Sequence, residues 1–164
     1  RFDVAPVITA PDRLSHLQNH LMLFFTGVSR IASDVAKAKI DNLKNRVQEL
    51  KTMHAMVDES IAILQNRHTP ISAFGELLDQ SWQLKRRLSE HVSNPGIDAL
   101  YAAAKEAGAT GGKIIGAGGG GFMLLFVRPE LQKHLRERLS HLVHVPFRFE
   151  NSGSRVVLYQ PNGL

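Results

Sequence analysis

The chain has 164 residues, of which 43% are hydrophobic and 21% are charged; it contains no cysteine and carries five more Lys and Arg than Asp and Glu. This balance predicts one compact soluble domain and argues against a disordered chain, and the lack of cysteine excludes disulfides and thiolate zinc sites. The basic residues are spread among acidic ones on helix-like segments, so we interpret them as a solvated surface and expect no nucleic-acid partner.

The chain begins at Arg1, without a recognisable signal or transit peptide, and we interpret it as a fragment. Its longest strongly apolar stretches, 21–25 and 122–127, are far shorter than the ~20 residues that a membrane-spanning helix needs. We therefore expect no membrane partner. The composition is compatible with a reducing cytoplasm, which is the location that we expect.

The N-terminal part of the chain predicts a helix, a strand and a second helix. Residues 11–20 predict a short helix capped near Asp12, and 21–26 predict a strand that Gly27 ends. Apolar residues at helical spacing then predict a helix within 29–39.

A long helix is predicted over 46–66 from one apolar stripe. The stripe consists of Val47, Leu50, Met53, Val57, Ile61 and Leu64. His54 lies on this stripe, and we interpret it as a buried or half-buried structural histidine in preference to a ligand.

Two further helices are marked by their start signals, Thr69-Pro70 and Asn94-Pro95, in which the first residue caps the helix and proline occupies its first position. Gly108 predicts the end of the second of these helices. The buried face of the first is predicted to contain Ile71, Phe74, Leu78, Trp82 and Leu88.

The residue pattern changes from helical to strand-like after Gly108. Residues 113–115 and 122–127 predict two strands, and the second is apolar enough to be covered on both faces. A helix opens at Pro129, with Leu131, Leu135, Leu139 and Leu142 on one side. Strands are then predicted at 145–150 and 155–159, with a turn at 151–153. The fold class is therefore α+β, with a small and mostly antiparallel sheet backed by helices.

Eight of the thirteen glycines fall between Gly108 and Gly121, and four of them are consecutive. Such a run is tolerated where the backbone needs positive φ or where another group approaches it closely, and consecutive free N–H groups can bind a phosphate. A tight hairpin needs only two residues, so we favour a ligand loop over a simple turn. The segment is neither a P-loop nor a dinucleotide fingerprint, because the first pattern is absent and a strand follows instead of a helix.

The segment Gly111-Gly-Lys-Ile-Ile-Gly-Ala-Gly-Gly-Gly-Gly-Phe122 resembles the third conserved motif of the GHMP kinase superfamily, which includes galactokinase, homoserine kinase, mevalonate kinase and phosphomevalonate kinase. Residues 94–130 and 25–30 are most similar to sugar-1-kinases of the D-glycero-D-manno-heptose 7-phosphate type. The resemblance implies that 1–164 is a GHMP kinase C-terminal domain, with a ferredoxin-like fold, whose N-terminal nucleotide-binding domain is absent from this sequence.

The resemblance further implies an ATP-dependent sugar kinase that phosphorylates the anomeric hydroxyl of D-glycero-D-manno-heptose 7-phosphate with Mg-ATP. Its implied partners are the sugar phosphate and its own N-terminal kinase domain. That domain carries the family's nucleotide loop, Mg²⁺-binding acid and catalytic acid, so the resemblance assigns no catalytic residue and no metal ligand here. We expect the chain alone to be inactive or nearly so.

The glycines that match the loop beside the phosphoryl-transfer centre are Gly116, Gly118, Gly119, Gly120 and Gly121. Lys113 and Arg30 are the candidate contacts for a substrate phosphate, with ordinary surface ion-pair residues as the alternative for each.

Two other functions stay open. The protein is a kinase of another sugar, such as L-fucose, or it is a non-catalytic GHMP-like module that binds a phosphorylated metabolite or a partner protein. His141 and His144 have a ligand-like spacing but no nearby acid, and we expect no metal site there.

Overall fold

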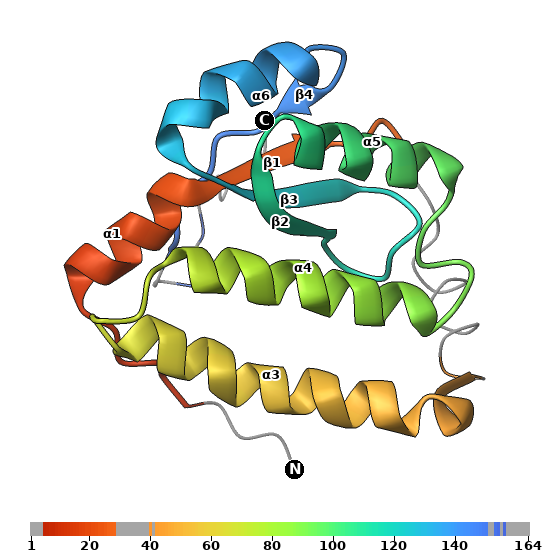
Figure 1. Cartoon of the computed structure of the whole chain (residues 1–164), viewed down its shortest axis with the longest axis horizontal. Helices are drawn as coiled ribbons and strands as arrows, with labels where there is room; N and C mark the ends of the chain where they lie inside the picture. The colour runs from red at the N-terminus through yellow and green to blue at the C-terminus, as the bar shows by residue number, and fades with distance from the viewer. Residues whose placement is uncertain (1–4, 29–39, 41, 151–152, 155, 157–164) are drawn as a thin grey trace, which may run out of the picture.

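The structure is a computed structural model of the chain, and it describes residues 5–28, 40, 42–150, 153–154 and 156. Five α-helices, two 3₁₀ turns and four strands lie in these residues (Figure 1). In chain order they are α1 (Pro11–His20), β1 (Leu21–Phe25), η1 (Leu43–Asn45), α3 (Val47–Gln65), α4 (Ser72–Arg87), α5 (Pro95–Glu106), β2 (Ala109–Ile114), β3 (Phe122–Val127), η2 (Pro129–Leu131), α6 (Gln132–Arg138) and β4 (Val143–His144).

The four strands form one sheet in the order β2-β3-β1-β4, and every neighbouring pair is antiparallel. In the register of the central pair, Leu23 lies opposite Leu124 and Phe25 opposite Phe122. The predicted α+β class with an antiparallel sheet is therefore confirmed.

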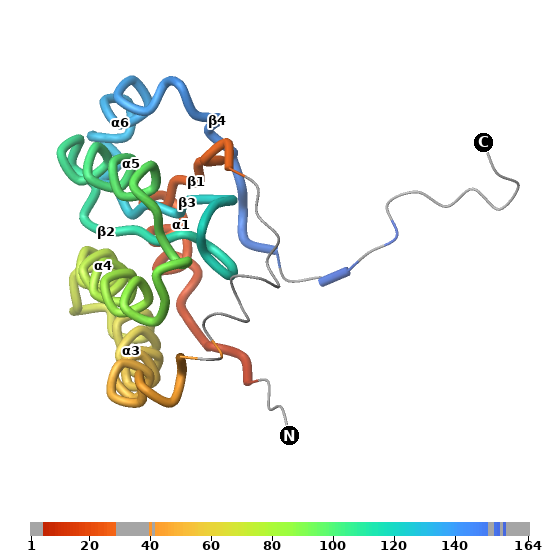
Figure 2. The backbone as a smooth tube through the Cα atoms, turned by 90° about the vertical axis from the view of Figure 1, so that its right-hand side faces the viewer, coloured from red at the N-terminus to blue at the C-terminus, as the bar shows by residue number. Residues whose placement is uncertain are grey.

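The helices α3 to α6 line up on one side of the sheet (Figure 2). The main core lies beneath α5 and α6, where Phe24, Ile114, Met123 and Leu125 are almost completely buried. On the opposite sheet face, Phe126 is also buried but Phe122 is 41% exposed. The prediction that this strand is covered on both faces is thus wrong at Phe122, because α1 and α4 cover this face at the Phe126 end, where His20 and Phe74 pack.

Helix α4 runs directly alongside β2, and two glycines permit the close approach. A Cβ on Gly111 would lie 2.0 Å from the Gly75 carbonyl oxygen, and a Cβ on Gly75 would lie 2.6 Å from the Phe126 ring. β2 therefore begins at Ala109, earlier than the predicted 113, since glycine's low strand propensity is overridden by this packing.

The long helix α3 was predicted to within one residue at each end, but its buried face is turned from the predicted stripe. Met56 and Ile63 are buried, whereas Val47 and Val57 are 51% and 54% exposed. The reason is that α3 packs mainly on α4, a single neighbour that covers a narrow face. His54 is exposed, so its predicted burial is wrong.

The two predicted helix caps, Asn94 and Thr69, differ in outcome. Asn94 caps α5, because its Oδ1 accepts the Ile97 amide at 3.0 Å, and Gly108 ends that helix region at φ 97°. Thr69 does not cap α4, which begins at Ser72 without a side-chain cap. The Thr69 carbonyl instead accepts the buried Arg13 guanidinium at 2.7 Å, so a tertiary contact occupies this turn.

The C-terminal strand prediction is wrong for 145–150. Pairing ends after β4, apart from one bond from the Val145 amide to the Leu23 carbonyl, because Pro146 has no N–H to continue the ladder. The Gln18 side chain instead bonds the Phe147 carbonyl and the Phe149 amide. The predicted helix in 29–39, Asn151 and Ser152 of the predicted turn, and all of the predicted strand at 155–159 except Val156 lie outside the described residues.

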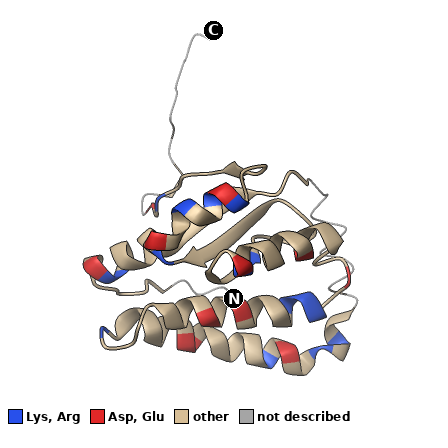
Figure 3. Ribbon diagram, turned by 45° about the horizontal axis from the view of Figure 1, so that its top comes forward, with Lys and Arg blue, Asp and Glu red and all other residues tan. Residues whose placement is uncertain are grey.

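Acidic and basic residues are interleaved along the helices (Figure 3). Such a mixed distribution differs from the single-sign stripe that a nucleic-acid surface presents. Among the described residues, every helix is too short or too polar to cross a lipid bilayer.

Candidate functional site

The glycine loop, defined here as residues 115–121, connects β2 to β3 at one end of the sheet. Its base is closed by a hydrogen bond from the Ile115 amide to the Phe122 carbonyl at 2.9 Å. Positive φ angles occur at Gly116, Gly118, Gly119 and Gly121, with values of 82°, 114°, 76° and 86°. An L-residue is strained in this region, so the loop conformation itself requires glycine at these four positions.

Two of the loop glycines are also needed for close contact with neighbouring backbone. A Cβ on Gly118 would lie 2.8 Å from the Val92 carbonyl oxygen, and a Cβ on Gly120 would lie 2.5 Å from the Val28 carbonyl oxygen. The loop therefore lies between the end of β1 and the segment that precedes α5. Part of the glycine run is explained by this packing alone.

The loop carbonyls are held by groups from three elements. Lys85 Nζ on α4 donates to the carbonyls of Ile114 at 2.9 Å and Gly116 at 2.7 Å. Asn94 Nδ2 at the start of α5 donates to the Gly119 carbonyl at 3.2 Å. At the end of β1, the Thr26 amide and hydroxyl both donate to the Gly121 carbonyl, at 2.8 and 2.9 Å.

The loop amides divide into engaged and available groups. The Gly119 amide donates to the Val92 carbonyl at 2.8 Å, and the Gly121 amide donates to the Val28 carbonyl at 2.7 Å. Among the described residues, the amides of Gly116, Ala117, Gly118 and Gly120 have no protein acceptor. Three consecutive amides are thus available at 116–118, which is the backbone feature of an anion-binding nest.

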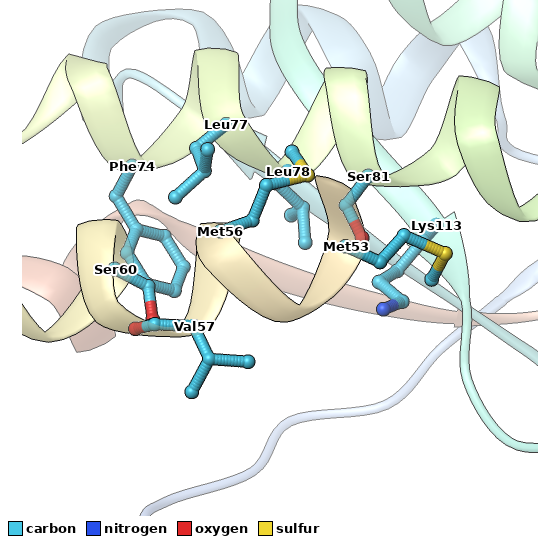
Figure 4. A pocket seen from close by; sticks show the side chains of 9 residues that line it. All are labelled: Met53, Met56, Val57, Ser60, Phe74, Leu77, Leu78, Ser81 and Lys113. Atoms are coloured by element: carbon cyan, nitrogen blue, oxygen red, sulfur yellow. The ribbon is translucent and has the colours of Figure 1, made fainter. Parts of the chain in front are cut away.

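Lys113 projects from β2 into a groove of about 190 Å³ between α3 and α4. The groove is lined by Met53, Met56, Val57, Ser60, Phe74, Leu77, Leu78, Ser81 and Lys113. The Lys113 side chain lies at one end, beside Met53 and Ser81 (Figure 4). Burial lowers the pKa of its ammonium, since the apolar walls displace water from the charge.

The Lys113 ammonium makes no ion pair or hydrogen bond with the rest of the described chain. The surface ion-pair alternative therefore has no partner among these residues. Arg30, the other candidate for a substrate phosphate, lies outside the described residues.

Lys85 is the residue of this region that sequence reasoning missed. The basic residues were all interpreted as a solvated surface, yet Lys85 is only 7% exposed. A signal was available, because Lys85 follows Leu78 and Trp82 at helical spacing and so lies on the buried stripe of α4.

The histidine pair has the geometry of ordinary packing. His141 is exposed, and the His144 ring packs on Phe24 with a centroid distance of 5.2 Å. Burial, and then the nearby Arg136 charge, lower the pKa of His144. Within the described ranges, no three Asp, Glu or His side chains are grouped closely enough to hold a metal ion.

Residues 61–144, about half of the chain, match the family described as GHMP kinases C terminal, so the chain belongs to this family. It is 33% identical over 126 residues to the D-glycero-alpha-D-manno-heptose 7-phosphate kinase of Campylobacter jejuni, which covers 76% of this chain and 37% of that protein. It is also 28% identical over 144 residues to the bifunctional fucokinase/GDP-fucose pyrophosphorylase of Arabidopsis thaliana, covering 85% of this chain and 13% of that protein.

Among solved structures, the mevalonate kinase of Methanococcus jannaschii is similar in fold, with a TM-score of 0.64 at 20% sequence identity. The match covers 81% of this chain and 41% of that one. The chain thus has the C-terminal fold of GHMP kinases, and it spans about a third of the length of its Campylobacter relative.

Proposed function

We propose that this chain is the C-terminal part of an ATP-dependent sugar kinase that phosphorylates the anomeric hydroxyl of D-glycero-D-manno-heptose 7-phosphate. The observation that carries the substrate assignment is the 33% identity to a heptose 7-phosphate kinase over most of the chain. The loop amides and the Lys113 ammonium, which have no protein partner among the described residues, support it with chemistry suited to anions.

Phosphoryl transfer asks a protein mainly for positioning and for stabilisation of negative charge. Backbone amides at 116–118 are suited to that task, because glycine at 116 and 118 leaves no side chain between the donors and a phosphate. We assign the glycine loop to the phosphate being transferred. Gly116, Gly118 and Gly120 contribute donors, while Gly119 and Gly121 hold the loop to the protein.

GHMP kinases generally use ATP and Mg²⁺. The loop amides fit an anionic phosphate, whereas the described part of the chain offers no cluster of metal ligands. We therefore place the Mg²⁺ ligands, the nucleotide loop and the catalytic acid in the N-terminal domain of the full protein. When bound, Mg-ATP supplies the phosphoryl group that is transferred.

Lys113 is our candidate for the phosphate that the sugar already carries. Residues along a strand advance ~3.3 Å each, so Lys113 and Gly116 lie within about 10 Å of each other. A sugar phosphate bound at Lys113 can therefore present a distant hydroxyl to the loop.

L-fucose is the second candidate substrate, because the Arabidopsis protein that is 28% identical to this chain is named as a fucokinase. Fucose carries no phosphate. The half-buried ammonium of Lys113, which has no acidic partner in the described part of the chain, therefore favours the heptose phosphate between the two.

The test is a phosphate-transfer assay on the full-length protein with ATP, Mg²⁺ and a panel of heptose 7-phosphate, unphosphorylated heptose and L-fucose. We expect the highest kcat/KM with heptose 7-phosphate. Lys113→Met should raise the KM for this substrate by at least about 10-fold, the loss of one charge-assisted contact, and leave the KM for unphosphorylated heptose unchanged.

The matched control is Lys51→Met, which removes an exposed lysine from α3. The proposal fails if the folded full-length protein transfers phosphate to no sugar. Binding of sugar phosphates without turnover would then support the non-catalytic module.

A further inference from the structure

We infer that Lys85 is a positioning residue of the glycine loop, and that its ammonium directs the Ala117 amide toward the ligand side by holding the Gly116 carbonyl against α4. The inference rests on the proposed function of the loop in phosphate transfer, and it assigns a role to a side chain that itself lies inside the fold.

The contacts of Lys85 are unusual for a lysine. Its side chain is 7% exposed on the inner face of α4, and lysine is seldom buried unless its charge is compensated. Two of the groups that its ammonium contacts are carbonyl oxygens, Ile114 at 2.9 Å and Gly116 at 2.7 Å. Both distances are typical of charge-assisted hydrogen bonds, which are about twice as strong as neutral ones.

The planarity of the peptide bond carries the effect of Lys85 to the next residue. In a trans peptide, the C=O of one residue and the N–H of the next point in opposite directions. Because the Gly116 carbonyl faces Lys85, the Ala117 N–H points away from α4. That amide has no acceptor among the described residues, so it is available to a ligand.

The same relation can be checked at Ile114, where the outcome is visible. Its carbonyl also faces Lys85, and the following Ile115 amide points the other way, to the Phe122 carbonyl on β3 at 2.9 Å. Lys85 therefore holds two peptide groups with one charged group, Ile114–Ile115 at the end of the β2 ladder and Gly116–Ala117 in the loop.

A second side chain acts in the same way on the other side of the loop. Asn94 Nδ2 donates to the Gly119 carbonyl at 3.2 Å, which directs the Gly120 amide away from α5. The Asn94 Oδ1 meanwhile accepts the Ile97 amide, so this side chain is fixed by the helix that it caps. The Ala117 and Gly120 amides are thus oriented from two helices, α4 and α5.

A preoriented donor contributes most where negative charge develops during the reaction, because it need not reorganise at that moment. Removal of Lys85 should therefore lower kcat more than it raises the KM for the sugar. Loss of a residue that only stabilised the fold would lower the fraction of folded protein and leave kcat per folded molecule unchanged.

The experiment uses the full-length protein with Lys85→Met, which keeps the length of the side chain and removes its donors, and Lys85→Arg, which restores a charged donor. Arg87→Met is the control, since Arg87 is exposed two residues further along α4. We expect Lys85→Met to lower kcat by about 100-fold or more, the range measured for loss of one such donor, with the sugar KM changed by less than about 3-fold. Lys85→Arg should recover part of kcat, and Arg87→Met should behave as wild type.

Hydrogen exchange provides a readout that needs no turnover. The bonded amides of Ile115, Gly119 and Gly121 should exchange faster in Lys85→Met, while those of α3 stay unchanged. If Lys85→Met does not fold, Lys85→Gln, which keeps a neutral donor, takes its place with the same expectations.

Wild-type kcat in a folded Lys85→Met protein would overturn the inference, as would a faster exchange spread over all of α4 together with an equal loss in kcat and sugar affinity. If the wild-type protein phosphorylates no sugar, the proposed function fails on its own. The exchange measurement then still decides the role of Lys85, and equal loop protection in wild type and variant would refute it.

Discussion

Each glycine of the loop is required for its own physical reason. Gly116 has positive φ but open space around its Cβ direction, whereas Gly118 combines positive φ with close contact to the Val92 backbone. A methyl group therefore strains the first position and clashes at the second. The two sites form a matched pair within one loop.

We predict that Gly116→Ala lowers the free energy of unfolding by about 1–2 kcal/mol, the strain of one left-handed alanine. Gly118→Ala should lower it by more than about 3 kcal/mol, because its Cβ would lie 2.8 Å from the Val92 carbonyl oxygen. Urea unfolding of the two variants measures both values. Equal losses would contradict the close packing of the loop on Val92.

Lys113 combines a proposed binding role with an unfavourable environment. Burial lowers the pKa of its ammonium in the folded state below the ordinary 10.5 of the unfolded chain. The charged form is thus disfavoured by folding, and this loss is fully present at neutral pH. It is relieved as the pH rises from the lowered folded value through 10.5, where the unfolded chain also loses its proton.

We therefore predict that Lys113→Met raises the thermal midpoint at pH 7, because the substitution removes a charge that folding moves out of water. The difference from wild type should shrink above pH 10. Calorimetry at pH 7 and pH 10.5 measures it, with Lys51→Met as control. A lower midpoint at pH 7 would mean that Lys113 contributes to stability in the free protein.

At the scale of elements, the edge strand β4 is held to β1 by a short ladder and by the His144 ring on Phe24. The pKa of His144 is lowered by burial and by the nearby Arg136 charge. Below its ordinary value of 6.5, the unfolded chain takes up a proton that the folded chain resists. The free energy of unfolding therefore keeps the contribution of the neutral His144 ring above pH 6.5 and loses it as the pH falls below 6.5.

We predict that the free energy of unfolding falls between pH 7 and pH 5 more steeply in wild type than in His144→Phe, whose ring keeps the contact with Phe24 but does not titrate. Urea unfolding at several pH values checks this difference, and NMR titration of the ring gives the pKa directly. A folded-state pKa at or above 6.5 would contradict the assignment.

The start of a helix was predictable where the sequence signal lies within a single turn. Asn94-Pro95 predicted the start of α5, because capping depends on residues within a single turn. The first half of β2 was not predicted because it contains Gly111 and Gly112. Glycine is required there by contacts with residues distant in the chain, such as the Gly75 carbonyl oxygen beside Gly111 and the Leu124 carbonyl oxygen beside Gly112. The predicted face of α3 was turned for a similar reason, as only its contact with α4 defines the inner side.

At the scale of the whole molecule, the sheet is thickly covered on one face and open near the glycine loop on the other. Ile115 and Phe122, at the two ends of the loop, are 47% and 41% exposed. The chain also spans 37% of its Campylobacter relative. We propose that the N-terminal domain of the full protein lies beside this end of the sheet.

We predict that the chain of 164 residues, expressed alone, transfers no phosphate from ATP to heptose 7-phosphate, because the groups assigned to the N-terminal domain are missing. A coupled ADP assay on this chain beside the full-length protein provides the measurement. Turnover by this chain alone would require catalytic groups within it and would refute the division of roles.

The amino-acid sequence by itself determined the α+β class, the two central strands, the bounds of α1, α3 and α5, and the family through one contiguous motif. These features depend on residues that are close in the chain, and periodicity, capping and glycine runs record them directly. Tertiary structure alone decided which loop amides are engaged, which face of α3 is buried, and which carbonyls the Lys85 ammonium contacts. Its carbonyl partners lie 29 and 31 residues away, so no local pattern of α4 contains them; they became neighbours only when β2 packed against that helix.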